Sequence, residues 1–173
     1  MNKNNRKEQL YHEAFKLFLS KPFEAVSIAD IEEASGMTRG AITYYAKDKL
    51  GLFYSVVKHY LVDTQNLKQK ITKTEFVSLK EFLEEYVNGC QETMNRFNDV
   101  DKAVQNASRA YMSLILQICK YFPDLHAQYL ENRNQEIIVW IGVLQKAIEN
   151  KEIKGDIDIM NTCLLYTSDA ADE

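Results

Sequence analysis

Proline and glycine are scarce in this chain: its 173 residues include only two prolines and six glycines. Folds built from many strands need many turns, and turns favour these two residues, so their scarcity predicts long helices. Apolar residues make up 46% of the chain, which is enough to bury a core. The composition therefore predicts an all-α globular fold and excludes a disordered chain.

Charge and cysteine content limit the function classes. The net charge is −4; residues 1–50 carry eight Lys/Arg and seven Asp/Glu (+1), and residues 51–173 carry 13 and 18 (−5). The N-terminal part is therefore better suited to meet phosphates. The three cysteines are widely spaced and have no histidine nearby, so we expect no metal site, no cofactor and a reducing cytoplasmic location. No run of 18 apolar residues occurs, so we expect no membrane span.

Hydrophobic periodicity predicts a first helix over residues 3–20. Leu10, Ala14 and Leu17 recur at i, i+4 and i+7, and Pro22 ends the pattern. A long helix is expected to begin after Asp48, which can cap it. Later helices are predicted over residues 78–96, 106–121 and 124–150.

Residues 27–46 have the spacing of a helix-turn-helix. Ser27 begins a short capping box with Asp30, and the helix after it is predicted to run to about Ser35, with Ile28, Ile31 and Ala34 inside. Gly36 follows where a left-handed residue is needed. Thr38 can cap the next helix, which runs to about Tyr45 and whose N-terminal N–H groups are expected to be free for an anion. About three residues separate these two helices, which is typical of the motif.

The second of these helices has two chemically different faces. At about 100° per residue, one side carries Arg39, Gly40, Thr43 and Tyr44, and the other carries Ala41, Ile42, Tyr45 and Ala46. An arginine can bind a phosphate or a guanine edge, glycine allows close approach, and hydroxyls can donate to phosphate. The first face therefore predicts contact with the major groove of DNA. The alternative is a small helical subdomain with an ordinary polar surface.

Residues 10–53 resemble the DNA-binding segment of the tetracycline-repressor (TetR) family. The resemblance is carried by residues 14–18, 27–31, 34–42 and 47–49, with Leu52. It implies an N-terminal three-helix DNA-binding domain over residues 1–50, and a helical ligand-binding and dimerisation domain over residues 51–173. On the family pattern the residues that face DNA are Ser27, Thr38, Arg39, Gly40, Thr43, Tyr44, Tyr45 and Lys49.

Three positions of the recognition helix depart from the family pattern, and one of them is Tyr45, which stands where the family often has histidine. Thr43 stands where the family has its first aromatic residue, which removes the usual contact between a phenol and a phosphate there. Ala46 stands where a bulky apolar anchor is usual, so we expect a compensating large residue nearby, such as Tyr45 turned inward.

The resemblance also implies a function for the C-terminal half. A regulator of this family acts as a homodimer on a pseudo-palindromic operator, most often as a repressor, and responds to a small molecule. Its last two long helices form the dimer. The residues expected to line the ligand pocket are Phe82, Tyr86, Cys90, Tyr111, Ile115, Cys119, Trp140 and Leu144. The alternative is that these side chains are plain core.

The end of the chain has an unusual composition. Residues 164–173 carry no helical stripe after Leu165 and resemble a translated sequencing adapter. We therefore expect the segment after about Cys163 to be foreign and the last helix to be truncated. The alternative is a genuine frayed terminus.

An enzyme and a helical interaction module are the two other function classes to compare with the sequence. His12, His59 and His126 stand alone in different predicted helices, and the sequence has no nucleophile–base pattern, carboxylate pair or glycine-rich phosphate loop. We therefore predict no catalytic residue and no enzyme. A helical protein-interaction module without regulatory DNA binding stays open; a mobility-shift assay with cognate palindromic DNA separates it from a regulator.

Overall fold

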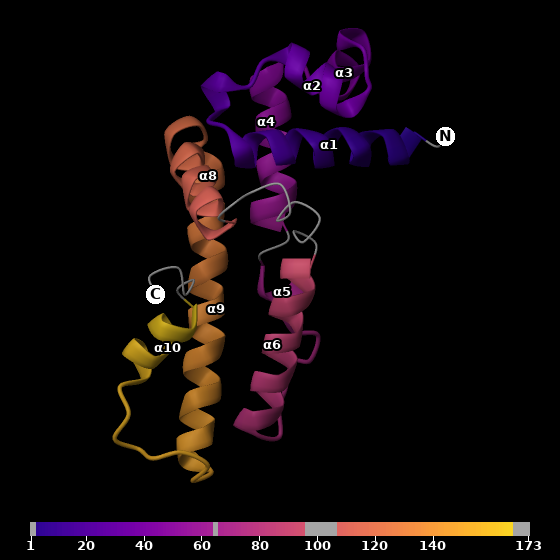
Figure 1. The fold of residues 1–173 in the computed structure, drawn as a ribbon. Coiled ribbons are helices and arrows are strands. Elements are labelled where there is room, and N and C mark those ends of the chain that lie inside the picture. Colours follow the sequence, from indigo (N-terminus) through magenta and orange to yellow (C-terminus); the bar gives the residue numbers. More distant parts are fainter. Residues whose placement is uncertain (1–2, 64–65, 96–106, 168–173) are drawn as a thin grey trace. The chain divides into compact units, whose positions relative to one another are not determined.

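The computed structural model describes residues 3–63, 66–95 and 107–167, and within these ranges every regular element is a helix (Figure 1). The predicted all-α class is therefore confirmed. In chain order the elements are α1 (Lys3–Ser20), η1 (Phe23–Ala25), α2 (Ile28–Ser35), α3 (Arg39–Tyr45), α4 (Lys49–Val57), η2 (Lys58–Asp63), α5 (Leu67–Lys70), α6 (Leu79–Asn95), α8 (Ala107–Tyr121), α9 (Pro123–Glu149) and α10 (Ile159–Thr167).

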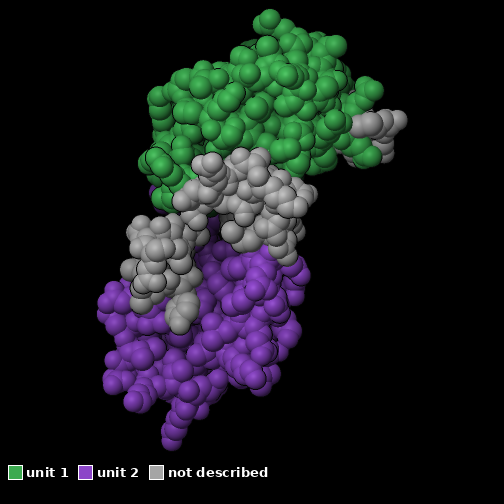
Figure 2. All heavy atoms as spheres, viewed as in Figure 1, with its two compact units in different colours: residues 1–63, 98–127 green, residues 64–97, 128–173 purple. Residues whose placement is uncertain are grey.

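The chain divides into two compact units, residues 1–63 with 98–127 and residues 64–97 with 128–173 (Figure 2). Below they are called unit 1 and unit 2. Helix α9 contributes residues 123–127 to unit 1 and its remaining residues to unit 2. The functional division expected at residue 50 stays a prediction.

Helix α1 builds the core of unit 1. It packs on α2, α4 and α8, and Leu10, Ala14 and Phe15 on its inner face are fully buried. Phe18 follows on the same face and contacts Phe53 of α4, with ring centroids 4.7 Å apart. Burying each large apolar side chain contributes about 1.5–3 kcal/mol, so this face accounts for much of the stability of unit 1.

Hydrogen-bonded caps fix the short helices of unit 1. The Ser27 hydroxyl accepts from the N–H of Asp30 at 3.1 Å, and the Asp30 carboxylate accepts from the N–H of Ser27 at 2.7 Å. Gly36 ends α2 in the left-handed region with φ 65°. Asp48 accepts from the N–H of Gly51 at 2.7 Å and begins α4. The predicted helix-turn-helix boundaries are therefore confirmed.

Two details of unit 1 differ from the prediction. Ala34 is exposed, and Ser35 is buried in its place, with its hydroxyl donating to the carbonyl of Ile31 at 2.6 Å. The long fourth helix changes to the π-helical turn η2 after Val57. A π-helical turn is wider than an α-helical turn. In η2 the consecutive residues Leu61 and Val62 both lie in the core.

Helices α6 and α9 carry most of the core of unit 2. Phe82 of α6 lies edge-to-face on Trp140 of α9, with ring centroids 4.9 Å apart. Cys163 of α10 is fully buried in the same cluster. Whether the segment after about Cys163 is foreign and the last helix truncated stays a prediction. The short α5 was not predicted, because residues 67–70 have no apolar stripe of helical spacing.

Candidate DNA interface

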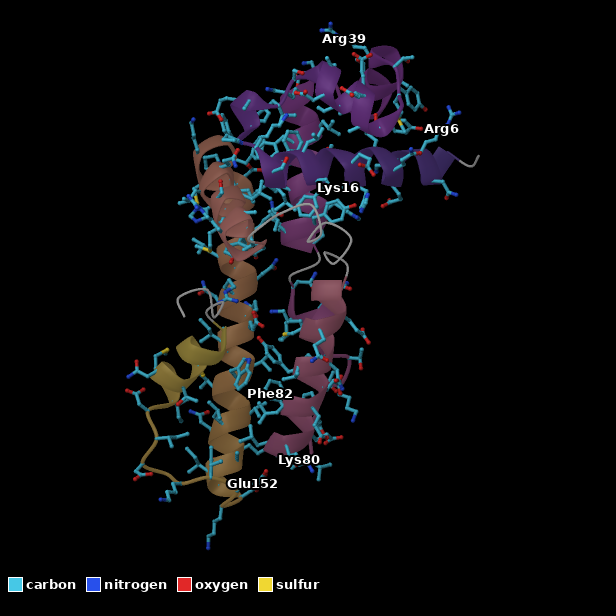
Figure 3. The ribbon with its side chains drawn as sticks, viewed as in Figure 1. Arg6, Lys16, Arg39, Lys80, Phe82 and Glu152 are labelled. Atoms are coloured by element: carbon cyan, nitrogen blue, oxygen red, sulfur yellow. The ribbon has the colours of Figure 1, made fainter. Side chains whose placement is uncertain are left out.

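The two faces of α3 are confirmed by burial. Ile42 is 2% exposed and Ala46 7% exposed, whereas Arg39, Gly40 and Thr43 are exposed to solvent. Tyr44 is 65% exposed. In Figure 3 the Arg39 side chain extends away from the ribbon at the beginning of α3. The cation, the bare backbone, the hydroxyl and the phenol predicted for one face therefore do lie together on the surface of unit 1.

The N-terminal end of α3 is less open than the sequence suggested. The Glu32 carboxylate of α2 accepts from the N–H of Arg39 at 2.5 Å, and the Thr38 hydroxyl accepts from the N–H of Ala41 at 3.4 Å. The expectation of free N–H groups at this end was therefore wrong for these two positions. A carboxylate seven residues earlier in the chain already serves as the anion.

Most predicted hydroxyl donors already have a role in the fold. The Thr43 hydroxyl donates to the carbonyl of Arg39 at 2.8 Å, and the Ser27 hydroxyl donates to Asp30 at 2.8 Å. Hydrogen bonds from the backbone N–H and then the hydroxyl of Ser27 hold the pKa of Asp30 below its ordinary value. Among the described residues the Thr38 hydroxyl only accepts, in its cap, so it can donate its proton to a phosphate.

Lys49 lies differently from the other predicted contacts. Its ammonium group donates to the carbonyls of Phe23 at 2.9 Å and Val26 at 2.7 Å, and lies 4.2 Å from the centre of the Phe23 ring. These bonds fix the chain that enters α2. A phosphate contact from Lys49 would require the ammonium to leave them, and it stays a prediction.

Tyr45 and Ala46 lie at the end of α3, where the family usually has a bulky apolar anchor in place of Ala46. Ala46 is buried, and Tyr45 is half-buried with its ring edge-to-face on Tyr44, the two ring centroids lying 5.2 Å apart.

A hollow of about 500 Å³ lies beside Tyr44 and Tyr45. It lies between α1 and α3, and its lining is Arg6, Gln9, Ser35, Gly36, Met37, Thr38, Ala41, Tyr44 and Tyr45.

The predicted pocket residues fall into two groups. Phe82, Tyr86, Trp140 and Leu144 are buried together in unit 2, with Cys90 packed against them. Tyr111, Ile115 and Cys119 lie on α8 in unit 1, where the first two are half-buried and Cys119 is exposed. That these side chains bind a ligand stays a prediction.

Unit 2 also contains a buried polar cluster that the sequence analysis missed. One Glu136 oxygen accepts from the Lys70 ammonium at 2.7 Å and from the Tyr86 hydroxyl at 2.5 Å. The other lies 3.6 Å from the Arg133 guanidinium and has no hydrogen-bond partner among the described residues. Burial, and then the Glu136 carboxylate, raise the pKa of Tyr86. Periodicity gave no signal for this cluster, because Glu136 continues the polar run 131–135 and directly precedes the apolar run 137–141.

Among residues 3–63, 66–95 and 107–167, no helix is both long and apolar enough to cross a membrane. Nor do three His, Cys, Asp or Glu residues come together there as a metal ion would require.

Comparison with known proteins relates this chain to bacterial transcriptional regulators. Residues 10–56 match the model of the bacterial regulatory proteins of the tetR family. The chain is 20% identical over 157 residues to the HTH-type transcriptional repressor KstR2 of Rhodococcus jostii (strain RHA1), and the alignment covers 91% of this chain and 72% of that protein. The match to the family model includes α2, α3 and all the predicted DNA contacts.

Two solved structures are similar in fold. One is a transcriptional regulator assigned to the TetR/AcrR family, with a TM-score of 0.63, 17% identity, and coverage of 94% of this chain and 81% of that one. The other is the reduced form of NemR from E. coli, with a TM-score of 0.59, 13% identity, and coverage of 94% and 82%. At these identities the likeness shows a shared fold.

Proposed function

The chain belongs to the TetR family of bacterial regulatory proteins, and from this we propose that it is a repressor that binds a pseudo-palindromic operator as a homodimer and releases it when a small molecule binds. Family membership supports a DNA-binding transcriptional regulator. Repression, dimerisation and ligand response are the proposal, as is the assignment of DNA contacts to individual residues.

The exposed face of α3 carries the proposal. Arg39 has no ion pair with any described residue, so its guanidinium is available for a guanine edge or a phosphate. Gly40 beside it has open space around the position of a Cβ, which lets the backbone approach the groove. Ile42 on the inner face holds the helix in place from below.

The outer face of α9 supports a homodimer. Between Asn134 and Gln145 the only charged residue is Glu136, which is buried. Ile138 is 59% exposed and Leu130 47% exposed. An uncharged and partly apolar helix face in water favours association, and a two-fold axis would give two recognition helices for successive major grooves.

The polar cluster of unit 2 supports a ligand response. A plain core gains little from a buried ion pair, whereas a ligand pocket typically combines aromatic walls with a few fixed polar groups. Tyr86 and Trp140 supply such walls beside Glu136, with the two rings 5.1 Å apart. The ligand can lower DNA affinity only as far as it binds the two states of the protein with different affinity.

Selection of genomic fragments by the full chain tests the proposal. We expect an inverted repeat, and an operator without inverted symmetry would contradict the dimer. Arg39→Ala should weaken operator binding by about 1–3 kcal/mol if the contact is bidentate to guanine. Lys80→Ala is the matched control, because Lys80 is an exposed cation of α6 in unit 2 (Figure 3).

A second measurement addresses the ligand. A broad screen of metabolites and drugs should yield a compound that lowers operator affinity, and its effect should be reduced in Tyr86→Phe. If no compound changes operator binding, the ligand response is wrong, while DNA binding stands on the selection experiment.

A further inference from the structure

We propose that Arg6 of α1 is a phosphate anchor that holds a DNA phosphodiester in the hollow between α1 and α3, beside the recognition helix. The inference rests on the proposed DNA binding. It adds a contact outside the helix-turn-helix, since Arg6 precedes residue 10, where the match to the family model begins.

Local structure fixes Arg6 beside α3. Arg6 lies in α1 one turn before Leu10, which is fully buried. The Gln9 side chain donates to the carbonyl of Ser35 at 3.2 Å and so ties α1 to the turn between α2 and α3. Arg6 and Gln9 line the hollow from α1, and Thr38, Tyr44 and Tyr45 line it from the other side. Figure 3 shows Arg6 near the N-terminal end of α1.

The chemistry of the hollow suits an anion. Arg6 is its one cation, and no acidic side chain belongs to its lining. A guanidinium can donate two parallel N–H bonds to two oxygens of one phosphate. Hydroxyl groups such as those of Thr38 and Tyr44 are common phosphate donors. A phosphate here would lie beside Tyr44, which is itself on the predicted DNA face.

Three other cations of α1 and α4 already have partners, whereas Arg6 has no ion pair among the described residues. Lys16 pairs with Glu13 at 3.1 Å, Lys49 donates to two carbonyls, and Lys7 lies 5.0 Å from the centre of the Tyr11 ring. Arg6 forms no ion pair with any described residue. It is exposed, so its guanidinium is accessible to a partner outside the chain.

Salt dependence of binding tests the inference. Arg6→Gln in the full chain should weaken binding several-fold both to the operator and to an unrelated duplex of equal length, because a phosphate contact carries no sequence information. The slope of log K against log salt should become less steep by about 0.9 for each lost contact, or about 1.8 for a dimer with two such contacts. Fluorescence anisotropy at several salt concentrations measures both quantities.

Two variants separate a specific contact from net charge. Lys7→Gln removes the same charge from the next residue and should leave the slope nearly unchanged. Arg6→Lys keeps the charge and should restore most of the slope. An unchanged slope in Arg6→Gln, or an equal loss in Lys7→Gln, overturns the inference. Far-UV circular dichroism checks that each variant is folded.

The outcome for the wild-type chain distinguishes this inference from the proposed function. If wild type binds no duplex at all, the proposed function fails. If it binds and Arg6→Gln binds equally well, only the anchor is wrong. Calorimetric titration with inorganic phosphate in the absence of DNA is the last arm: saturable binding that Arg6→Gln removes, while DNA binding and its salt slope stay unchanged, would assign the hollow to a free anion and overturn the DNA contact.

Discussion

The two units of the chain place their polar groups differently. In unit 1 the described core is apolar and aromatic apart from Ser35, and polar side chains such as Ser27, Thr38 and Asp48 cap helices within three residues of themselves. In unit 2 an ion pair is buried: Lys70 is 8% exposed and Glu136 fully buried, although 66 residues separate them in sequence. The helix caps of unit 1 depend on local hydrogen bonds, whereas the buried ion pair of unit 2 depends on the tertiary fold.

This difference indicates which unit a single substitution disrupts more. A cap contributes about 1 kcal/mol, and its loss leaves the rest of the helix in place. A buried charge whose partner is removed has no water to replace that partner. We therefore expect unit 2 to be the more easily disrupted by a single substitution, and the more readily adjusted by a ligand that supplies or removes one polar contact.

The largest expected effect is for Lys70→Met. This substitution leaves the buried Glu136 carboxylate without its ammonium partner, so the free energy of unfolding of unit 2 should fall by about 3–5 kcal/mol. Trp140 is the only tryptophan of the sequence and lies in the same core, so its fluorescence in a urea titration reports unit 2.

The double variant Lys70→Met with Glu136→Leu is the control for this experiment. It removes both charges, so a large part of the lost stability should return. A loss below about 1 kcal/mol in Lys70→Met would show that the ion pair has little weight, and that the two units are equally tolerant.

A smaller effect is expected for Gly89→Ala in α6. A Cβ at Gly89 would lie 2.0 Å from the carbonyl oxygen of Lys70, so α5 would have to move. Such overpacking typically costs about 1–3 kcal/mol. Gly142→Ala in α9 is the matched control: a Cβ there would meet no atom of another element within 4 Å, and alanine should stabilise the helix by up to about 1 kcal/mol. Equal destabilisation by both substitutions would contradict the close approach of α5.

Most of the fold followed from the sequence because it depends on local signals. The periodicity of α1, the capping box at Ser27 and the left-handed Gly36 all act within a few residues, and the predicted elements there match the structure. The turn η2 and the short α5 did not follow. A four-residue helix has no period to detect, and a π turn depends on which side chains the core accepts.

The candidate site followed only in part. The helical period of about 100° per residue correctly placed Arg39 and Ile42 on opposite faces of α3, because this assignment needs no tertiary information. It could not show that Lys49 donates to carbonyls 23 and 26 residues earlier, nor that Glu32 occupies the N–H of Arg39. The cluster at Glu136 was missed for the same reason: its partners come from different helices, and only the packed fold brings them together.

The smallest expected effect is in unit 1, where an exposed ion pair links η1 to the end of α8. Lys120 donates to Glu24 at 2.6 Å, and the Tyr121 hydroxyl also donates to it. These bonds, first that from Lys120, lower the pKa of Glu24 from 4.5 to about 2. Ionised Glu24 therefore favours the folded state above about pH 4.5, and this contribution is lost as the pH falls from 4.5 through 2.

Glu24→Gln should accordingly lower the Tm of the chain slightly at pH 7, and the difference from wild type should shrink as the pH approaches 2. The pair is exposed to solvent, so we expect added salt to reduce the difference as well. Thermal unfolding followed by circular dichroism at pH 7, pH 4 and pH 2.5 measures the trend. Glu33→Gln is the matched control, because Glu33 is exposed and has no ion pair among the described residues. If Glu33→Gln showed the same pH-dependent difference, or if the Glu24→Gln difference did not change with pH, the contact between η1 and α8 would carry no stability of its own, and unit 1 would depend on its apolar core alone.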